Sequence, residues 1–329
     1  MIGVNSVTRD ARLNVKSVAN DGAQAIIRVA APAKINLRLR VVGVRSDGYH
    51  LLDSVVVPVR LFDQLVIEVR RARETRVAIH CTGDSPEVPT DQSNLAVRAA
   101  RMYADRCGLP LDIQLQLTKR IPVGAGLGGG SSDAAAVLRG LNSIADRPVE
   151  AARLARWALE LGADVPFFLF GRPAQMTGIG EELSPFQLPS AAQGPLVLVF
   201  PGMGLATKEV YGRYDGSLTS ESVASSICAL TPGQAPLQDW LSNDLEAAAF
   251  QVLPKLGKLK RHLRALGARA VVMTGSGSAM FGFWSQRECA EAAARQLRAD
   301  GMWAHGTEVL EQLPVVERDE QQVGGRQVG

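Results

Sequence analysis

Residues 122–135 read PVGAGLGGGSSDAA, a glycine-rich stretch that runs directly into DAAAVLRGLN at 133–142, a segment typical of a helix. Successive glycines allow backbone N–H groups to turn toward one point and form a nest for an anion. The start of a helix adds its own unpaired N–H groups and the positive end of its dipole. Ser131 and Ser132 stand at that start and can cap the helix or offer a hydroxyl to a phosphate or a magnesium ion. The stretch therefore predicts a phosphate site.

The loop also matches parts of two known nucleotide-binding motifs. The pattern GxGxxG at 124–129 matches a dinucleotide-binding motif, but that motif lies directly between a strand and its helix, whereas KRIPV at 119–123 intervenes here. The spacing of 124–131 suits a Walker A loop, but Gly130 occupies the position of its lysine. A glycine-rich helix start packed closely against neighbouring backbone stays open as an alternative. Without that lysine, the positive charge for phosphate chemistry has to come from elsewhere.

Two other segments offer the missing charged groups. PAKINL at 32–37 places Lys34 at the start of a strand, and LGADVPFFLF at 161–170 places Asp164 at the edge of an apolar segment that we expect to be a strand. An acid next to buried apolar residues is unfavourable unless it has a partner or a role. Each residue alone would be taken as a solvated surface group. Together, with the glycine loop between them in sequence, they indicate a kinase site.

The composition is that of a globular protein of about two domains. The 329 residues are 46% hydrophobic and 21% charged, and the formal net charge of +3 is too small to argue for nucleic acid. The four cysteines form no C-x-x-C pair, which argues against a disulfide framework or a zinc site and favours a reduced cytosol. No apolar run approaches the ~18 residues of a membrane helix, and the N-terminus is a poor signal peptide. A mildly basic protein of this kind suits an anionic small molecule.

Hydrophobic periodicity predicts an α+β architecture, because strands and helices follow one another without regular βαβ alternation. The expected domains are a loose extension at 1–24, a first domain at 25–190 with the glycine loop, a second at 191–312, and a flexible tail at 313–329. The expected strands are 25–44 in two runs on either side of Pro32, 51–60, 65–70, 111–119, 165–170, 196–202 and part of 268–284. The expected helices are 93–107 with Ser93 as its cap, 131–145, 148–162 ending at Gly162, several between 207 and 266, and 286–299.

Three motifs in order resemble one known family. PAKINL at 32–37, PVGAGLGGGSSDAA at 122–135 and MTGSGSAMFG at 273–282 are similar to the motifs of the small-molecule kinases named for galactose, homoserine, mevalonate and phosphomevalonate kinases, the GHMP kinases. The resemblance extends from about residue 28 to 310 and implies a two-domain fold: a mixed N-terminal sheet with helices, and a C-terminal ferredoxin-like α/β sandwich. RSDGYHLLDSVV at 45–56 and LGADVPFFL at 161–169 resemble the branch that phosphorylates the 2-hydroxyl of a diphosphocytidyl methylerythritol, in the non-mevalonate route to isoprenoids.

The resemblance also implies roles for particular residues, with ATP and Mg²⁺ as cofactors. Asp164 would be the general base and Lys34 would keep its carboxylate ionised. ATP would contact Lys119 and the loop residues Pro122, Val123, Gly124, Ala125, Gly126, Leu127, Gly128, Gly129, Gly130, Ser131 and Ser132, with Ser131 as a possible metal ligand. The substrate would contact Asn36, Tyr49, His50, Asp164, Thr207 and Tyr211, with Tyr49 and His50 on the cytosine, while Thr274, Gly275, Ser276 and Gly277 would approach the phosphate end.

Two other functions stay open at this point. A sister kinase acting on mevalonate or homoserine would share the phosphate machinery, and only the DGYH segment at 47–50 argues against it. A non-catalytic nucleotide sensor on the same fold should have lost Lys34 or Asp164, and this chain keeps both. The expected partner is a small molecule, with no nucleic acid and no membrane, for a cytoplasmic monomer or weak homodimer. Arg45-Ser46 departs from the basic residue and proline that the family usually has before DGYH.

Overall fold

The computed structural model describes residues 24–83, 88–214 and 237–319. The expected N-terminal extension therefore lies outside the described residues, apart from Gln24, which begins the first strand. No helix within the described ranges is long and apolar enough to cross a membrane.

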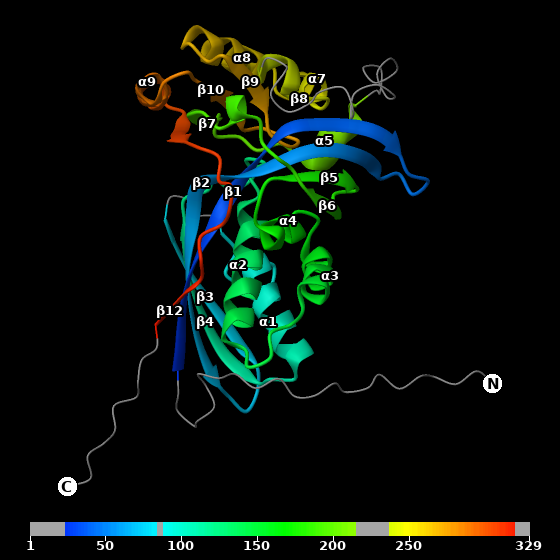
Figure 1. The fold of residues 1–329 in the computed structure, drawn as a ribbon, viewed down its shortest axis with the longest axis vertical. Helices are drawn as coiled ribbons and strands as arrows, with labels where there is room; N and C mark the ends of the chain where they lie inside the picture. Colours follow the sequence, from blue (N-terminus) through cyan, green and yellow to red (C-terminus); the bar gives the residue numbers. More distant parts are fainter. Residues whose placement is uncertain (1–23, 84–87, 215–236, 320–329) are drawn as a thin grey trace.

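A large sheet is built around one long hairpin, β1 (Gln24–Val44) and β2 (His50–Arg71). The strand order is β12-β1-β2-β4-β3, with β3 (Arg76–Gly83) parallel to β4 (Leu111–Lys119). β5 (Ala174–Gly178) pairs with β2 and with β6 (Glu182–Pro185), and β8 (Ser242–Asn243) pairs with β1. In Figure 1 the hairpin runs from this sheet to beneath the second half of the molecule. The two runs expected around Pro32 are thus one strand, whose register shifts between Pro32 and Ala33.

Four helices cover one face of the large sheet: α1 (Leu95–Cys107), α2 (Gly129–Ile144), α3 (Ala151–Leu161) and α4 (Val165–Phe170) (Figure 1). Their apolar side chains pack on alternate residues of the strands, such as Ile27, Ile67 and Ile113.

Two expectations about these helices were wrong. Asn94 caps α1 in place of Ser93, accepting the Ala96 N–H at 2.9 Å.

The second error concerns the apolar segment 165–170, which we expected to be a strand and which is the helix α4. Pro166 stands in its first turn, where the missing N–H is not needed. Its side chains are apolar because the helix is packed against both α2 and α3. An apolar run of this length does not distinguish a buried strand from a buried helix. α3 ends at Gly162, as expected.

The second sheet has the order β11-β7-β10-β9, formed by β7 (Leu196–Phe200), β9 (Ala270–Met273), β10 (Met280–Phe283) and β11 (Trp303–Thr307). All of its pairs are antiparallel. In chain order, helices lie between β7 and β9 and again between β10 and β11. This is the ferredoxin-like arrangement. Its helices are α5 (Thr207–Gly212), α6 (Leu237–Trp240), α7 (Glu246–Val252), α8 (Lys255–Ala265) and α9 (Arg287–Ala299), and a 3₁₀ turn at Ser190–Ala192 precedes β7.

The alternation of side chains along β7 explains how the two halves join. Val197 and Val199 pack in a core with α7, α8 and α9. Leu196, Leu198 and Phe200 point to the other face and share a core with the β1–β2 hairpin. The hairpin is therefore common to both halves, and this places Lys34 and Asn36 of β1 at the junction.

The expected tail at 313–329 is corrected in part. β12 (Glu317–Asp319) pairs antiparallel with β1, with Ile27 opposite Arg318. Residues 320–329 lie outside the described ranges. This short polar segment has no hydrophobic periodicity that would predict a strand. It is a strand because the exposed edge of β1 supplies its hydrogen-bonding partners.

Candidate active site

The glycine loop forms a tight series of turns between β4 and α2. Gly124, Gly126 and Gly128 all have positive φ, at 71°, 81° and 74°. Gly128 is the N-cap of α2, so the free N–H groups of the first helical turn face the loop. This alternation of left-handed glycines is the geometry of an anion nest at a helix N-terminus.

The same glycines are also packed closely against other backbone. A Cβ on Gly126 would lie 2.9 Å from the Gly277 carbonyl oxygen and 3.0 Å from that of Thr274. The loop is tied on both sides, because the Lys34 N–H donates to the Leu127 carbonyl at 2.9 Å and the Ala279 N–H donates to that of Ala125 at 3.0 Å. The structure thus supports the close-packing alternative, and the nest stays a prediction. The loop is fixed in place by β1 and by the second half of the chain.

Lys34 and Asp164 meet, as expected. The Lys34 Nζ lies 3.8 Å from the Asp164 Oδ2 and donates to the Asn36 Oδ1 at 2.8 Å. Lys34 is buried, whereas the Asp164 side chain is 38% exposed toward the cavity. Asp164 immediately precedes α4, so the start of that helix sets its position. A buried ammonium beside a solvent-reached carboxylate can hold that carboxylate in place for a proton transfer.

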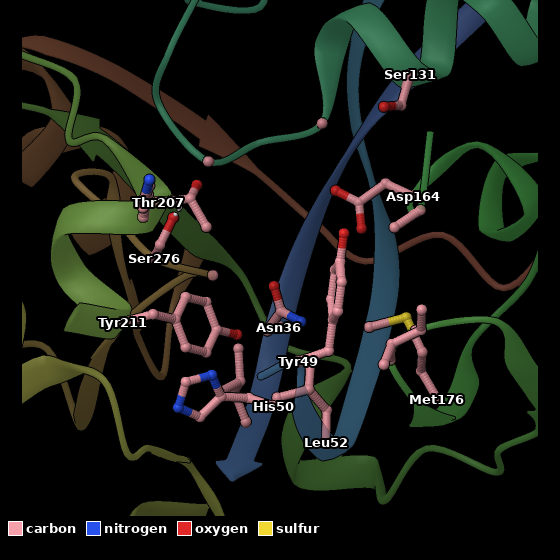
Figure 2. Close-up of a pocket in the computed structure, with 18 of the residues that line it drawn as sticks. Asn36, Tyr49, His50, Leu52, Ser131, Asp164, Met176, Thr207, Tyr211 and Ser276 are labelled. Carbon is pink, nitrogen blue, oxygen red and sulfur yellow. Dashed lines mark hydrogen bonds between the residues drawn. The ribbon is translucent and has the colours of Figure 1, made fainter. Parts of the chain in front are cut away.

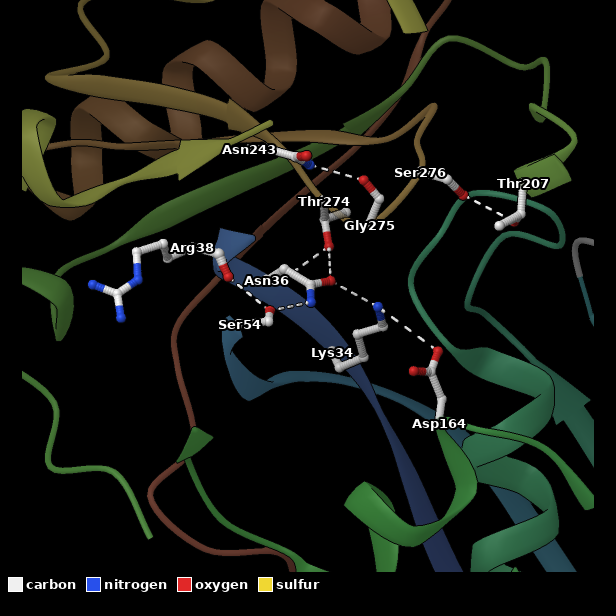
Figure 3. A network of polar contacts seen from close by, with 10 residues as sticks. All are labelled: Lys34, Asn36, Arg38, Ser54, Asp164, Thr207, Asn243, Thr274, Gly275 and Ser276. Carbon is white, nitrogen blue, oxygen red and sulfur yellow. Dashed lines mark hydrogen bonds and ion pairs between the residues drawn. The ribbon is translucent and has the colours of Figure 1, made fainter. Parts of the chain in front are cut away.

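Asn36 is the centre of a polar network that joins the two halves (Figure 3). Its Nδ2 donates to the Ser54 Oγ at 2.8 Å, and its backbone N–H donates to the Thr274 Oγ1 at 3.0 Å. Asn243, on β8, donates from Nδ2 to the carbonyl oxygens of Met273 and Gly275, both at 2.8 Å. The loop Thr274–Gly277 is therefore held against β1 from two sides.

Lys119, which was expected to contact ATP, is also part of a buried ion cluster. It is buried, and its Nζ donates to the Asp63 Oδ2 and, at 2.8 Å, to the Asp133 Oδ2. The Asp63 Oδ1 accepts the backbone N–H groups of Arg120 and Ile121 at 2.6 and 2.9 Å. Asp63 thus holds the residues that enter the loop, Asp133 lies in the helix that leaves it, and Lys119 joins the two. We call these three residues the loop anchor.

The loop anchor has unusual electrostatics. Burial raises the pKa of Asp133 to about 7, although Lys119 opposes the shift. The pKa of Lys119 is raised because its two carboxylates outweigh the effect of burial. The Asp133 Oδ1 has no hydrogen-bond partner among the described residues. Lys119 also lines a cavity of about 220 Å³ together with residues 122–130, so its ammonium lies beneath the loop.

A larger cavity, of about 1010 Å³, lies on the other side of the loop, and Gly126 and Gly128 line both cavities. Figure 2 shows Ser131 and Asp164 at one end of the large cavity, with His50 and Tyr211 toward the other. This cavity brings together the expected residues Lys34, Asn36, Tyr49, His50, Ser131, Asp164, Thr207, Tyr211, Gly275 and Ser276. A ligand spanning both cavities would pass over the glycine N–H groups.

The cavity has three aromatic residues, Tyr49, His50 and Tyr211. The His50 ring packs on Tyr211 at 4.7 Å between centroids, with 40° between the planes. Tyr49, one residue earlier and 59% exposed, extends its ring toward Asp164 in Figure 2. Tyr49 precedes β2 and His50 begins it, and both side chains line the large cavity. Burial raises the pKa of Tyr211 to about 12, with a smaller effect of Asp164, so its phenol stays neutral.

The two serines of the loop differ. Ser131 lines the large cavity, whereas Ser132 is buried and its hydroxyl has no partner among the described residues. Thr207 also lines the cavity, and its hydroxyl lies 3.0 Å from that of Ser276 (Figure 3). Sequence reasoning missed Lys208, which lines the cavity, and the supporting residues Ser54, Asp63 and Asn243, and it considered Asp133 only as a possible metal ligand. These lie far from the motifs they support, apart from Asp133 within the loop motif and Lys208 beside Thr207.

Comparison with known proteins gives the same family at the level of sequence. The model of the GHMP kinases N terminal domain matches residues 94–172, and that of the GHMP kinases C terminal domain matches 231–301. A 4-diphosphocytidyl-2-C-methyl-D-erythritol kinase of Thermus thermophilus is 43% identical, covering 83% of this chain and 94% of the relative. The chain belongs to the GHMP kinase family. An enzyme of the same name from Syntrophotalea carbinolica is 40% identical, over 83% of this chain and 95% of its own.

Solved structures of GHMP kinases are similar to this chain in fold. A crystal structure of 4-(cytidine 5'-diphospho)-2C-methyl-D-erythritol kinase has a TM-score of 0.70 and 40% identity, covering 85% of this chain and 99% of its own. A homoserine kinase from Cytophaga hutchinsonii has a TM-score of 0.63 at 17% identity, over 89% of this chain and 97% of its own, and shares the fold. This GHMP kinase therefore has the expected α+β architecture and is a small-molecule kinase, which implies the use of ATP.

Proposed function

We propose that this GHMP kinase transfers the γ-phosphoryl group of ATP to the 2-hydroxyl of 4-diphosphocytidyl-2-C-methyl-D-erythritol. The observation that carries the proposal is the position of the Lys34–Asp164 pair, 3.8 Å apart, in one cavity between the glycine loop and the His50–Tyr211 pair. The relatives at 43% and 40% identity bear the name of that activity. A cytidine diphosphate ester has both a flat base and a polar end with a hydroxyl, which suits a cavity with an aromatic end and a catalytic end.

The chemistry assigned to the residues is simple. The substrate hydroxyl oxygen attacks the γ-phosphorus, its proton passes to Asp164, and the bond to the β-phosphate oxygen breaks to release ADP. Lys34 holds the Asp164 carboxylate, and the N–H groups of residues 124–130 stabilise charge on the phosphates. Phosphoryl transfer depends mainly on such positioning and charge stabilisation.

Magnesium fits the oxygen donors at the catalytic end. The Ser131 hydroxyl lines the large cavity there, and Mg²⁺ favours one or two protein oxygens with phosphate and water for the rest. The ion would neutralise negative charge on the ATP phosphates. We propose Ser131, rather than the buried Ser132, as the loop serine available to it.

The base of the substrate would lie between the aromatic residues. The imidazole of His50 offers one donor and one acceptor, and a cytosine edge requires both. Tyr211 offers a flat face beside it. Because Tyr49 extends toward Asp164 in Figure 2, we propose that it contacts the middle or the erythritol end of the substrate. We also propose that the chain acts in the cytoplasm, since Cys81, Cys107 and Cys289 are free thiols.

The direct test measures ATP consumption by the purified full chain with Mg²⁺. Turnover with 4-diphosphocytidyl-2-C-methyl-D-erythritol, and none with mevalonate or homoserine, is the expected result. Turnover with mevalonate or homoserine alone would keep the kinase chemistry and overturn the substrate. ATP binding without turnover of any of the three would indicate a nucleotide sensor instead.

A further inference from the structure

A second large cavity lies apart from the active site. Its volume is about 670 Å³, and it is formed by α2, α3, α4, β6, Arg318 of β12 and the segment leading into β12 (helices in Figure 1). The walls are mostly apolar, with Leu154, Leu169, Phe170 and Leu183 among them. None of its lining residues lines either cavity at the glycine loop. Its size is in the range of small-molecule sites, about 300–1,000 Å³.

One end of this cavity adjoins a polar pocket of about 320 Å³. Arg139, Leu169 and Phe170 line both spaces, and Arg172 lines the polar one. We call the two spaces together the α4 groove. It therefore has an apolar body and an end occupied by arginines.

Two arginines of the α4 groove, Arg139 and Arg172, have no counter-charge among the described residues. The half-buried Arg139 donates from Nη2 to the Pro314 carbonyl oxygen at 2.7 Å and forms no ion pair within the described ranges. Burial lowers its pKa, the direction expected for a cation removed from water without a carboxylate beside it. Arg172 lies over the Phe170 ring at 5.0 Å and likewise has no acidic partner in the part of the chain that is described. Glu181 is the one acidic residue among the groove's lining residues.

We propose that the α4 groove binds an anionic amphiphile, with an apolar tail against Leu154 and Leu169 and a phosphate or carboxylate head held by Arg139 and Arg172. Arginine binds such heads with strong, often bidentate hydrogen bonds. An anion there would also offset the cost of burying an unpaired guanidinium. The proposed binding to the α4 groove is independent of the alcohol substrate that the kinase phosphorylates.

The groove is connected to the catalytic base through one short helix. Asp164 immediately precedes α4, while Pro166 and Phe170 of the same helix line the groove. A ligand in the groove thus packs on the helix that positions Asp164. It does not enter the loop cavities, so ATP does not compete with it.

The test is calorimetric titration of the full chain with decyl phosphate below its micelle concentration. We expect saturable binding at one site, with the same affinity in the presence of a non-hydrolysable ATP analogue. Arg139→Gln and Arg172→Gln should each weaken binding about tenfold or more, because each removes a charged hydrogen-bond donor. Ala155→Phe should abolish binding by filling the apolar wall. Arg98→Gln, on the exposed side of α1, is the matched control and should leave it unchanged.

Three outcomes would overturn the proposal. Decanol could bind as tightly as decyl phosphate, which would remove the role of the arginines. The ATP analogue could displace the ligand, which would place it at the loop. Binding could require anionic vesicles, which would indicate a membrane surface in place of a free amphiphile. Arg172 is exposed, so its variant keeps the test decisive even if Arg139→Gln does not fold.

Discussion

Replacing Lys119 by methionine should lower the free energy of unfolding far more than replacing its partner Asp133 by asparagine. Lys119 is buried between Asp63 and Asp133, so Lys119→Met leaves two buried carboxylates without their cation. Removing one member of a buried ion pair costs about 3–5 kcal/mol of the free energy of unfolding. Asp133→Asn keeps the shape and leaves Lys119 paired with Asp63 alone. We expect that variant to lie within about 1 kcal/mol of the wild type near neutral pH, because Lys119 keeps its ion pair with Asp63 and a neutral amide costs less to bury than a carboxylate.

The pH dependence of stability should separate the two variants further. Burial raises the pKa of Asp133 to about 7, from 3.8 when it is exposed. Between about pH 4 and pH 7 the folded chain then keeps a proton that the unfolded chain has released. The free energy of unfolding therefore falls as the pH rises through this window, by up to about 1.4 kcal/mol per pH unit for one proton. The charged and titratable groups around Asp133 are Lys119, Asp63 and, more weakly, Cys81.

The assay is urea unfolding followed by circular dichroism at several pH values from 5 to 8. In Asp133→Asn, the free energy of unfolding should no longer show the pH dependence that one proton contributes. In Lys119→Met, the KM for ATP should rise because the ends of the loop are released. If Lys119→Met costs less than about 1 kcal/mol, or if Asp133→Asn costs as much as Lys119→Met, the loop anchor does not stabilise the fold as described.

Three other predictions concern the active site. Asp164→Asn should lower kcat by about 10²–10⁴-fold, the usual contribution of a general base, with ATP affinity unchanged in a direct titration; retention of most of the activity would assign the base elsewhere. His50→Ala should raise the KM for the cytidylyl substrate much more than that for ATP, and equal effects would place His50 outside the substrate pocket. Gly126→Ala should raise the KM for ATP, because its Cβ would lie 2.9 Å from the Gly277 carbonyl at a φ of 81°. Gly130→Ala is the control, since its nearest contact would be 3.8 Å away and its φ is not positive, and similar effects of both would contradict the close-packing argument.

Much of the secondary structure followed from local patterns. The alternation of 111–119 predicted β4, and Gly162 marked the end of α3, because these patterns depend on the element's own residues. The segment 165–170 was wrongly predicted as a strand, since an apolar run of that length suits either element. The cap of α1 was misplaced by one residue, because Ser93 and Asn94 are both good caps and only the course of the chain selects one.

The family and the candidate residues of the site could be inferred from residue types and local spacing. The glycine loop, Lys34 and Asp164 can be identified from residue type and local spacing. A nest requires glycine, and a carboxylate can accept a proton. Tertiary structure alone decided the distances and the partners. The pairing of Lys119 with Asp63 and Asp133, the packing of His50 on Tyr211, and the lack of a counter-charge for Arg139 among the described residues all depend on contacts between residues distant in the chain. Burial and pairing are properties of those contacts, and no local pattern contains them.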